Sequence, residues 1–167
     1  MEQAMHRNPD EGYRALAPAV LGYFRSNRVG EPEDLTGDVF VSVTENLARF
    51  RGSDAALRRW VFTVAHHRMI DEFRRSGRSI AAPEGTHSDR GGVDGEPFDV
   101  DLSRAIAGLT DEQREVIVLR FVADLSIHDV AKITGRRAGA VKMAQARGLA
   151  ALRGRLDEIE SQRAGPG

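Results

Sequence analysis

The chain has 167 residues, of which 41% are hydrophobic and 29% are charged, and its 24 basic and 25 acidic residues nearly cancel. No apolar run approaches the roughly 20 residues that cross a bilayer, and no apolar signal segment is present, so direct membrane insertion is excluded and a cytoplasmic location is expected. The absence of cysteine excludes disulfides and cysteine-based zinc sites.

Three helices are predicted in the first half of the chain. The first runs from Asp10 to about Ser26, where Pro18 should kink it. The second runs from Glu31 to Phe50, with proline and acids in its first turn, and its apolar face holds Leu35, Val39, Val43 and Leu47. The third runs from Ala55 to about Ser76 and should bury Leu57, Val61, Val64, Ile70 and Phe73. Residues 49–78 carry eight arginines and only three acids.

A linker is predicted at residues 79–101. This stretch is rich in Gly, Pro, Ser, Asp and Glu, lacks periodicity, and holds six acids against one arginine within residues 81–101. Such composition is typical of a flexible tether.

The second half is predicted to be helical, at 102–109 and 111–122, followed by a helix-turn-helix at 125–153. Thr110 with Gln113 and Ser126 with Asp129 have the spacing of capping boxes. Gly135 suits a left-handed exit from the first helix of the pair, and Val141 suits packing of the second helix, which starts at about Ala138.

The second helix of this pair has two distinct faces. At 100° per residue, the inward face holds Val141, Gln145, Gly148 and Leu152, and the outward face holds Gly139, Met143, Ala146 and Arg147. Residues 132–155 contain seven basic residues and no acid. A short helix pair with one basic side is typical of DNA-binding proteins. The expected fold is therefore all-α, with two small helical domains (8–78 and 102–160) joined by a flexible acidic linker.

Two segments resemble those of the extracytoplasmic-function sigma factors, the small two-domain branch of the bacterial sigma family. In the first domain these are residues 34–40 (DLTGDVF) and the segment from Trp60 through residues 65–75 (AHHRMIDEFRR). In the second domain they are residues 109–120 and the segment from Val141 to Arg147. Together, and in this order, they identify the chain as a member of that branch.

The resemblance implies a promoter-specificity subunit that binds core RNA polymerase and both single- and double-stranded promoter DNA. It implies polymerase docking by the second helix, on a coiled coil of the large subunit, through Asp34, Leu35, Asp38, Val39 and Phe40. It implies that the upstream element is held as single strand, by arginines and planar groups at Phe50, Arg51, Arg58, Arg59, Trp60, His67, Arg68, Arg74 and Arg75. It implies major-groove recognition of the distal element by Arg136, Arg137, Gly139, Ala140, Lys142, Met143 and Arg147. The acidic linker would thread the RNA exit path, although its acids could equally serve only to keep the tether expanded.

This chain departs from the family pattern at Gly37, His67, Arg137, Ala140 and Met143. The departures remove hydroxyl and amide groups from promoter-contacting positions and leave the expected fold and polymerase docking intact. Since neither an added C-terminal domain nor a cysteine is present, an anti-sigma factor is expected to cover both domains and can hold the protein at the membrane.

Other functions fit parts of the sequence. An autonomous helix-turn-helix regulator would explain the second domain alone. A metal-dependent hydrolase would use His66, His67 and Asp71, but two or three ligands on one helix are weak support. Trp60 could be a core residue, the arginines a solvated face, and the histidines ordinary surface residues. We expect no catalytic residue, metal or cofactor.

Overall fold

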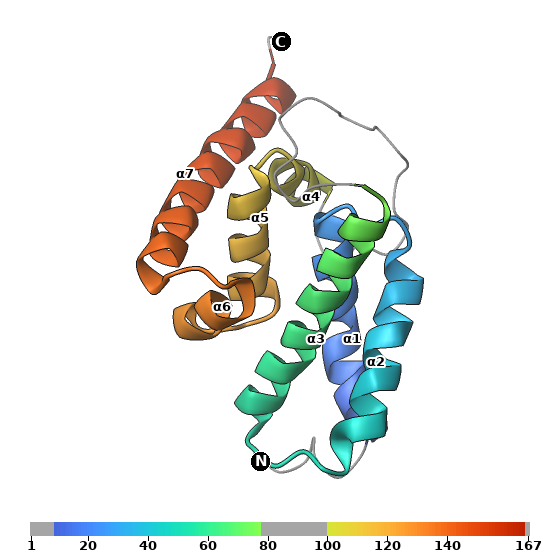
Figure 1. Ribbon diagram of the computed structural model, residues 1–167. Helices are drawn as coiled ribbons and strands as arrows, with labels where there is room; N and C mark the ends of the chain where they lie inside the picture. The colour runs from blue at the N-terminus through green and yellow to red at the C-terminus, as the bar shows by residue number, and fades with distance from the viewer. Residues whose placement is uncertain (1–8, 78–99, 166–167) are drawn as a thin grey trace.

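The computed structural model describes residues 9–77 and 100–165, and within them it contains helices and no strand (Figure 1). The expected all-α fold is confirmed. The N-terminal unit, residues 9–77, holds α1 (Pro9–Ser26), α2 (Pro32–Leu47) and α3 (Asp54–Arg75). The C-terminal unit, residues 100–165, holds α4 (Val100–Ala107), α5 (Asp111–Ile117), the π-helical turn η1 (Val118–Val122), α6 (Ile127–Thr134) and α7 (Ala138–Arg163). The predicted linker lies outside the described residues, except for its last two residues, which already belong to α4.

The three helices of the N-terminal unit pack around a common core. In α1 the apolar residues that recur at helical spacing, Leu16, Val20, Tyr23 and Phe24, are all buried, and the helix runs on through Pro18. The α2 helix ends at Leu47, three residues before the expected end at Phe50.

The buried face of α3 differs from the one predicted. Leu57 and Val61 are buried as expected, whereas Val64, Ile70 and Phe73 are only half-buried. The core positions are taken instead by Phe62, Ala65, His66 and Met69. A single apolar stripe fails here because α3 packs against α1 and α2 and also against α6, so it buries residues on more than one side.

Local capping defines the helices of the C-terminal unit. Thr110 Oγ1 accepts a hydrogen bond from Gln113 N at 3.2 Å, and Gln113 Oε1 accepts one from Thr110 N at 3.3 Å, so the first predicted capping box is confirmed. Ser126 Oγ caps α6 at 3.1 Å from Asp129 N. Gly135 leaves α6 with φ of 69°, where glycine carries no steric cost. The predicted helix at 111–122 is wrong in one respect, because its last turn is π-helical rather than α-helical.

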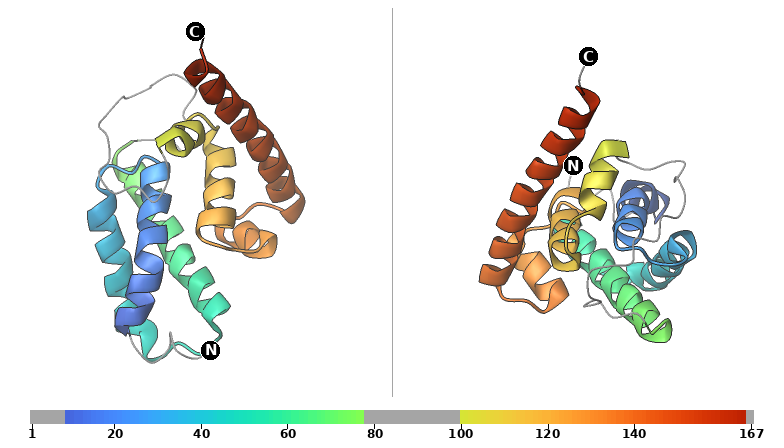
Figure 2. Two further views of the ribbon diagram at one scale, coloured as in Figure 1. Left: turned by 180° about the vertical axis from the view of Figure 1, so that it is seen from behind. Right: turned by 90° about the horizontal axis from the view of Figure 1, so that it is seen from above.

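The two units pack directly on each other. The α1 helix contacts α5 and η1, and α3 contacts α6, so that buried residues of both units form one continuous hydrophobic cluster. The α7 helix lies on the far side of α5 and α6 from the N-terminal unit (Figures 1 and 2). This arrangement leaves the outer side of α7 free and covers part of α3.

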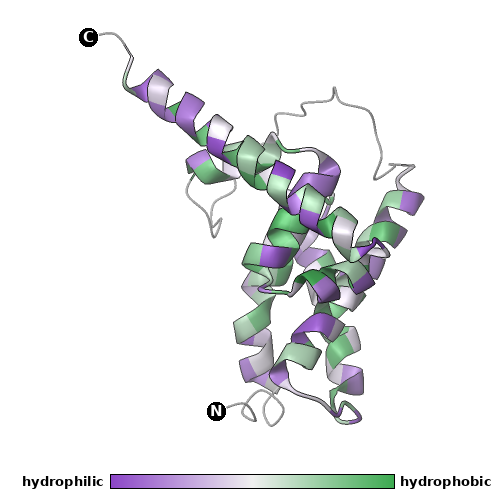
Figure 3. Cartoon of the chain, turned by 90° about the vertical axis from the view of Figure 1, so that its left-hand side faces the viewer, coloured by the Kyte–Doolittle hydropathy of each residue, from purple (hydrophilic) through white to green (hydrophobic). Residues whose placement is uncertain are grey.

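Hydropathy follows this packing. Hydrophobic and hydrophilic residues are interspersed along every helix, and the C-terminal end of α7 projects past the other helices (Figure 3). Within the described residues, no helix is both long enough and apolar enough to cross a membrane.

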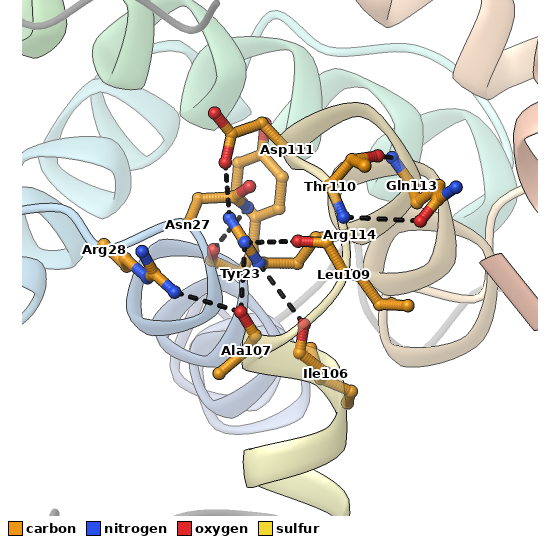
Figure 4. A network of polar contacts seen from close by, with 10 residues as sticks. All are labelled: Tyr23, Asn27, Arg28, Ile106, Ala107, Leu109, Thr110, Asp111, Gln113 and Arg114. Carbon is orange, nitrogen blue, oxygen red and sulfur yellow. Dashed lines mark hydrogen bonds and ion pairs between the residues drawn. The ribbon is translucent and has the colours of Figure 1, made fainter. Parts of the chain in front are cut away.

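Arg114 organises the junction between α4 and α5 and is itself buried (Figure 4). Its guanidinium donates to the carbonyl of Leu109 at 2.7 Å and to Asp111 Oδ1 at 2.8 Å, and makes longer bonds to the carbonyls of Ile106 and Ala107. Ile106 and Ala107 lie in the last turn of α4, where carbonyls have no acceptor bond from the amide four residues further along a helix. Arg28 of the N-terminal unit donates to the same Ala107 carbonyl at 3.0 Å, which links the junction to the other unit.

Candidate nucleic-acid and polymerase interfaces

The predicted upstream-element residues extend along all of α3. Ser53 caps its start by accepting a hydrogen bond from Ala56 N at 3.2 Å. With 22 residues, the helix is about 33 Å long, so Arg58 and Arg59 lie far from Arg74 and Arg75. Arg68, between them, donates to Ser42 Oγ at 2.8 Å. The arginines therefore form an extended track rather than a single pocket.

Phe50 and Trp60 form a stacked aromatic pair at the start of this track. Their ring centroids are 5.2 Å apart and their planes differ by only 5°. Both side chains are half-buried against the core, so Trp60 is neither fully core nor fully exposed. A Cβ on Gly52 would lie 2.9 Å from Phe50 Cζ, so glycine is what allows this loop to lie close to the ring. Arg51 donates from Nη1 to the carbonyls of Ala48 and Phe50, both at 2.9 Å, which holds its guanidinium beside the pair.

The two adjacent histidines have different environments. His67 is exposed, as a nucleic-acid contact requires. His66 is buried, which corrects its interpretation as a surface residue. Among the residues that the structure describes, no three potential ligands from His, Cys, Asp and Glu are placed to hold a metal ion.

His66 belongs to a buried polar cluster that joins the two units, and Glu115 of α5 lies at its centre. Glu115 Oε1 accepts from the Tyr23 hydroxyl at 3.1 Å and lies 2.9 Å from His66 Nδ1, while the Tyr23 hydroxyl is also 3.1 Å from His66 Nδ1. Glu115 Oε2 accepts from Arg136 Nη1 at 3.1 Å. Glu115 is only 3% exposed, so its carboxylate is almost fully removed from water.

The electrostatics of this cluster favour a charged Glu115. Burial alone would raise the pKa of its carboxyl, but the hydrogen bond and charge of His66, with Arg136 and Tyr23, hold the pKa below its usual value. Burial, reinforced by the neighbouring Glu115 carboxylate, raises the pKa of the Tyr23 hydroxyl well above its usual range. Tyr23 therefore stays protonated and can donate.

Two further ion pairs connect α3 to the C-terminal unit. Arg58 Nη1 lies 3.2 Å from Asp124 Oδ2, and Arg59 Nη1 lies 3.3 Å from Asp129 Oδ1. Asp124 has φ of 55°, a left-handed conformation that aspartate tolerates better than most residues. The Asp129 carboxylate was predicted to complete a capping box with Ser126, but it pairs with Arg59 instead.

The helix-turn-helix places its second helix as predicted. Val141 and Gly148 of α7 are buried and Gln145 and Leu152 are half-buried, while Gly139, Met143, Ala146 and Arg147 are exposed. A Cβ on Gly148 would lie 2.9 Å from Ile117 Cγ1, so glycine allows α7 and α5 to pack closely. Arg120 of η1 donates to Gln145 Oε1 of α7 at 2.8 Å and also to the carbonyl of Leu125. These bonds link α7 to η1 and to the loop between η1 and α6.

The predicted DNA contacts in this helix pair separate into two sets. Arg137, Gly139, Ala140, Lys142, Met143 and Arg147 are all exposed. Arg136 is not free, because it pairs with Glu115 and lies 3.7 Å from Glu112 Oε1. In this structure Arg136 therefore supports the buried cluster and is not available for the predicted major-groove contact.

The predicted docking face on α2 also needs correction. Asp34 and Asp38 are exposed as expected, but Leu35, Val39 and Phe40 are buried in the core. Phe40 packs edge-on against Tyr13 of α1, with ring centroids 4.8 Å apart. A helix presents only one face to a partner, and here the apolar residues of the motif hold α2 in the unit. The exposed side of α2 instead combines Asp34 and Asp38 with Val41, which is 59% exposed.

The sequence did not indicate the buried cluster of Glu115, the bond of Arg120 to α7, or the ion pairs of Asp124 and Asp129 with α3. One signal was available for Glu115, since it directly precedes the apolar run Val116–Leu119 and an acid beside such a run is a candidate for burial. The partners Tyr23 and His66, which lie 92 and 49 positions away, had no local signal.

Comparisons with known proteins agree across the chain. The family descriptions Sigma-70 region 2 and Sigma-70, region 4 match residues 13–79 and 105–154. The chain is 30% identical over 164 residues to the ECF RNA polymerase sigma factor SigD of Mycobacterium tuberculosis, covering 89% of this chain and 76% of that protein. It is 32% identical over 144 residues to the ECF RNA polymerase sigma factor RpoE of Cereibacter sphaeroides, and the match covers 79% of this chain and 77% of that protein. In fold it is similar to the sigma factor RpoE of Bartonella quintana, which was solved in complex with the anti-sigma factor NepR. The TM-score is 0.66 at 24% sequence identity, and the match covers 89% of this chain and 96% of that chain.

Proposed function

Because the chain belongs to the extracytoplasmic-function sigma factors and acts in promoter-specific initiation by RNA polymerase, we propose how its surfaces divide that function. We assign polymerase docking and upstream-element binding to a domain of residues 8–78, and distal-element recognition to a domain of residues 102–160. The contribution of this chain is binding, and the chemistry of RNA synthesis belongs to the polymerase.

This assignment rests on the exposed outer side of the first part of α7, which carries neutral and basic residues and no acidic ones. Gly139 and Ala140 have small side chains that leave room for close approach to base edges. Met143 is an exposed apolar side chain on the same surface, to which Lys142 and Arg147 add positive charge. Arginine is suited to bidentate contact with guanine, and lysine to contact with phosphate. The buried Val141 and Gly148 anchor the opposite side, so the helix has one side for packing and one for DNA.

For the upstream element, we propose that single-stranded DNA lies along α3. Arg68, Arg74 and Arg75 supply positive charge, and the stacked Phe50–Trp60 pair supplies planar surface at one end. Stacking of bases on aromatic side chains contributes about 1–3 kcal/mol per base in single-strand binding.

For polymerase docking, we propose the exposed side of α2, with Asp34 and Asp38 as charged contacts and Val41 as an apolar contact. This face replaces the one inferred from sequence, since Leu35, Val39 and Phe40 are buried. We also propose an anti-sigma partner for this chain, supported by the similar fold of a sigma factor that was solved with one.

The experiment is transcription by purified sigma-free core polymerase on a fragmented genomic library, with and without the protein, followed by sequencing of transcript starts. New discrete starts that share two spaced motifs would support the proposal. Tight binding to duplex DNA without any effect on polymerase would instead indicate an autonomous helix-turn-helix regulator.

The docking face is tested separately by Asp38→Arg, measured as affinity for core polymerase. The matched control is Glu158→Arg, which makes the same type of charge change at an exposed position of α7. Loss of affinity only in Asp38→Arg supports the α2 face, and equal affinities of the two variants contradict it.

A further inference from the structure

The side chain of Met143 is an apolar group on an otherwise small and basic surface of α7. It is 54% exposed, whereas Val141, on the other side of the helix, is fully buried. At 100° per residue, Met143 lies about 200° round the helix axis from Val141, so it faces almost directly away from the protein. Its neighbours on the same side, Gly139, Ala140 and Ala146, are exposed and small. The methionine therefore projects above the surface around it.

This projection is not part of a hydrophobic patch. Along α7, from Ala138 to Arg163, the other large hydrophobic side chain that is exposed is Leu149, at 41%. Leu149 follows Met143 by six positions, which places it about 120° away round the helix axis. The residues that flank Met143 on its own side of the helix are cationic, Lys142 and Arg147, and both are exposed. Met143 is thus a single apolar side chain on a surface suited to the DNA backbone.

The major groove contains one apolar group on its base edges, the C5-methyl group of thymine. The other groups on those edges are hydrogen-bond donors and acceptors. A thioether that covers such a polar group takes it out of water without replacing its hydrogen bonds fully, which costs free energy. A thioether against the thymine methyl group instead removes apolar surface of both partners from water. The unbranched methionine side chain, with three rotatable bonds, can adapt to the position of that methyl group.

We propose that Met143 is a specificity-determining residue of this chain, which selects a thymine in the distal promoter element by contact of its side chain with the C5-methyl group. The small residues around Met143 allow the helix to approach the groove floor closely enough for this contact. The inference rests on the proposed role of α7 in distal-element recognition, and it adds the base and the chemical group that the helix reads.

The first test compares transcript starts from the genomic library for core polymerase with the unmodified chain, Met143→Ala or Leu149→Ala. Both variants shorten an exposed apolar side chain of α7 to alanine, which is favourable in a helix, so Leu149→Ala is the matched control. We expect Met143→Ala to lose the preference for thymine at one position of the distal motif. Leu149→Ala should retain the preference at that position.

The second test measures the methyl contact itself. The probe is the duplex promoter of the strongest start, in which one thymidine of the distal element at a time is replaced by deoxyuridine, which lacks only the C5-methyl group. Binding by polymerase assembled with each form of the chain is measured by competition. At one position the replacement should weaken binding about two- to fivefold for the unmodified chain and for Met143→Leu, which keeps an apolar side chain. For Met143→Ala the same replacement should weaken binding less than about 1.5-fold, because the contact has already been removed.

Equal effects of deoxyuridine with the unmodified chain and with Met143→Ala overturn the proposal, as does a distal motif without an A·T pair. A loss of affinity for core polymerase without DNA in Met143→Ala, as large as its loss of promoter binding, would show a protein contact and also overturns it. None of these results removes the transcript starts of the unmodified chain, so the proposed function would stand. Absence of those starts overturns the proposed function, and this inference with it.

Discussion

Substitution of Gly148 tests how α7 is positioned for promoter recognition. Gly148 is buried in α7, and an added Cβ would lie 2.9 Å from Ile117 Cγ1 and 3.2 Å from its Cδ1. Ile117 is itself buried, and its Cγ1 is an inner atom of the side chain. Gly148→Ala therefore requires either a change of the Ile117 rotamer or a shift of α7 away from α5.

The expected change in the free energy of unfolding for Gly148→Ala follows from two opposing effects. Overpacking of a well-packed core costs about 1–3 kcal/mol, while replacement of glycine by alanine inside a helix stabilises by about 0.5–1 kcal/mol. We expect Gly148→Ala to lower the free energy of unfolding by about 0.5–2 kcal/mol. A Cβ on Gly154, two turns further along the same helix, meets nothing within 4 Å, so Gly154→Ala should raise the free energy of unfolding by about 0.5–1 kcal/mol.

The assay is urea denaturation of the full chain followed by circular dichroism, together with promoter-directed transcription by core polymerase. Gly148→Ala should lower both stability and promoter-specific transcription, because displacement of α7 moves Lys142, Met143 and Arg147 relative to α5. Gly154→Ala should leave the transcription unchanged. If both variants stabilise the protein to the same extent, close packing of α5 and α7 does not position the recognition helix, and the reasoning is refuted.

Three other predictions concern the buried cluster, a helix cap and the exposed side of α7. Glu115→Ala should lower the free energy of unfolding by about 2–4 kcal/mol, because its buried partners lose the carboxylate that accepts their hydrogen bonds. The control Glu112→Ala removes a half-exposed carboxylate and should lower it by less than about 1 kcal/mol. The folded-state pKa of Glu115 is depressed, so the charged carboxylate stabilises the folded protein above the unfolded pKa of about 4.3. This stabilisation is lost as the pH falls through the folded-state pKa. The difference in free energy of unfolding between the unmodified chain and Glu115→Gln should therefore narrow on acidification. Ser126→Ala should lower stability by about 1 kcal/mol in thermal unfolding, because it removes the cap of α6; no loss would contradict the role of the cap. Arg147→Ala should reduce discrimination between promoter and mutated distal element by about 1–3 kcal/mol in competition binding, and a uniform loss across sequences would show a phosphate contact instead.

Local signals in the sequence predicted the helices and several of their caps. Thr110 with Gln113, Ser126 and Gly135 act through neighbours within a few positions, so the caps that they form could be predicted without knowledge of the fold. The two faces of α7 followed from helical periodicity for the same reason, and the exposed residues at 139, 143, 146 and 147 were correctly predicted.

Burial was less predictable wherever a helix packs against more than one neighbour. The α3 helix buries Phe62 and Met69 and leaves Ile70 and Phe73 half-buried, because it packs against α1 and α2 as well as α6 and its buried residues do not form one stripe. The Phe62 ring, for example, lies 6.0 Å from the Tyr23 ring of α1. The motif at residues 34–40 combines exposed with buried residues, and only the structure separates exposed Asp34 and Asp38 from buried Leu35, Val39 and Phe40.

The sequence by itself determined an all-helical chain with a helix-turn-helix and the motifs of a sigma factor, because those features depend on short-range spacing and residue type. Only the tertiary structure decided that Glu115 meets Tyr23 and His66, and that Asp124 and Asp129 reach Arg58 and Arg59. These partners are separated by 49 to 92 positions, and no local pattern encodes which charges meet when two helical units pack. The pairing of Arg58 and Arg59 is therefore a property of the packing of the units and not of either segment alone.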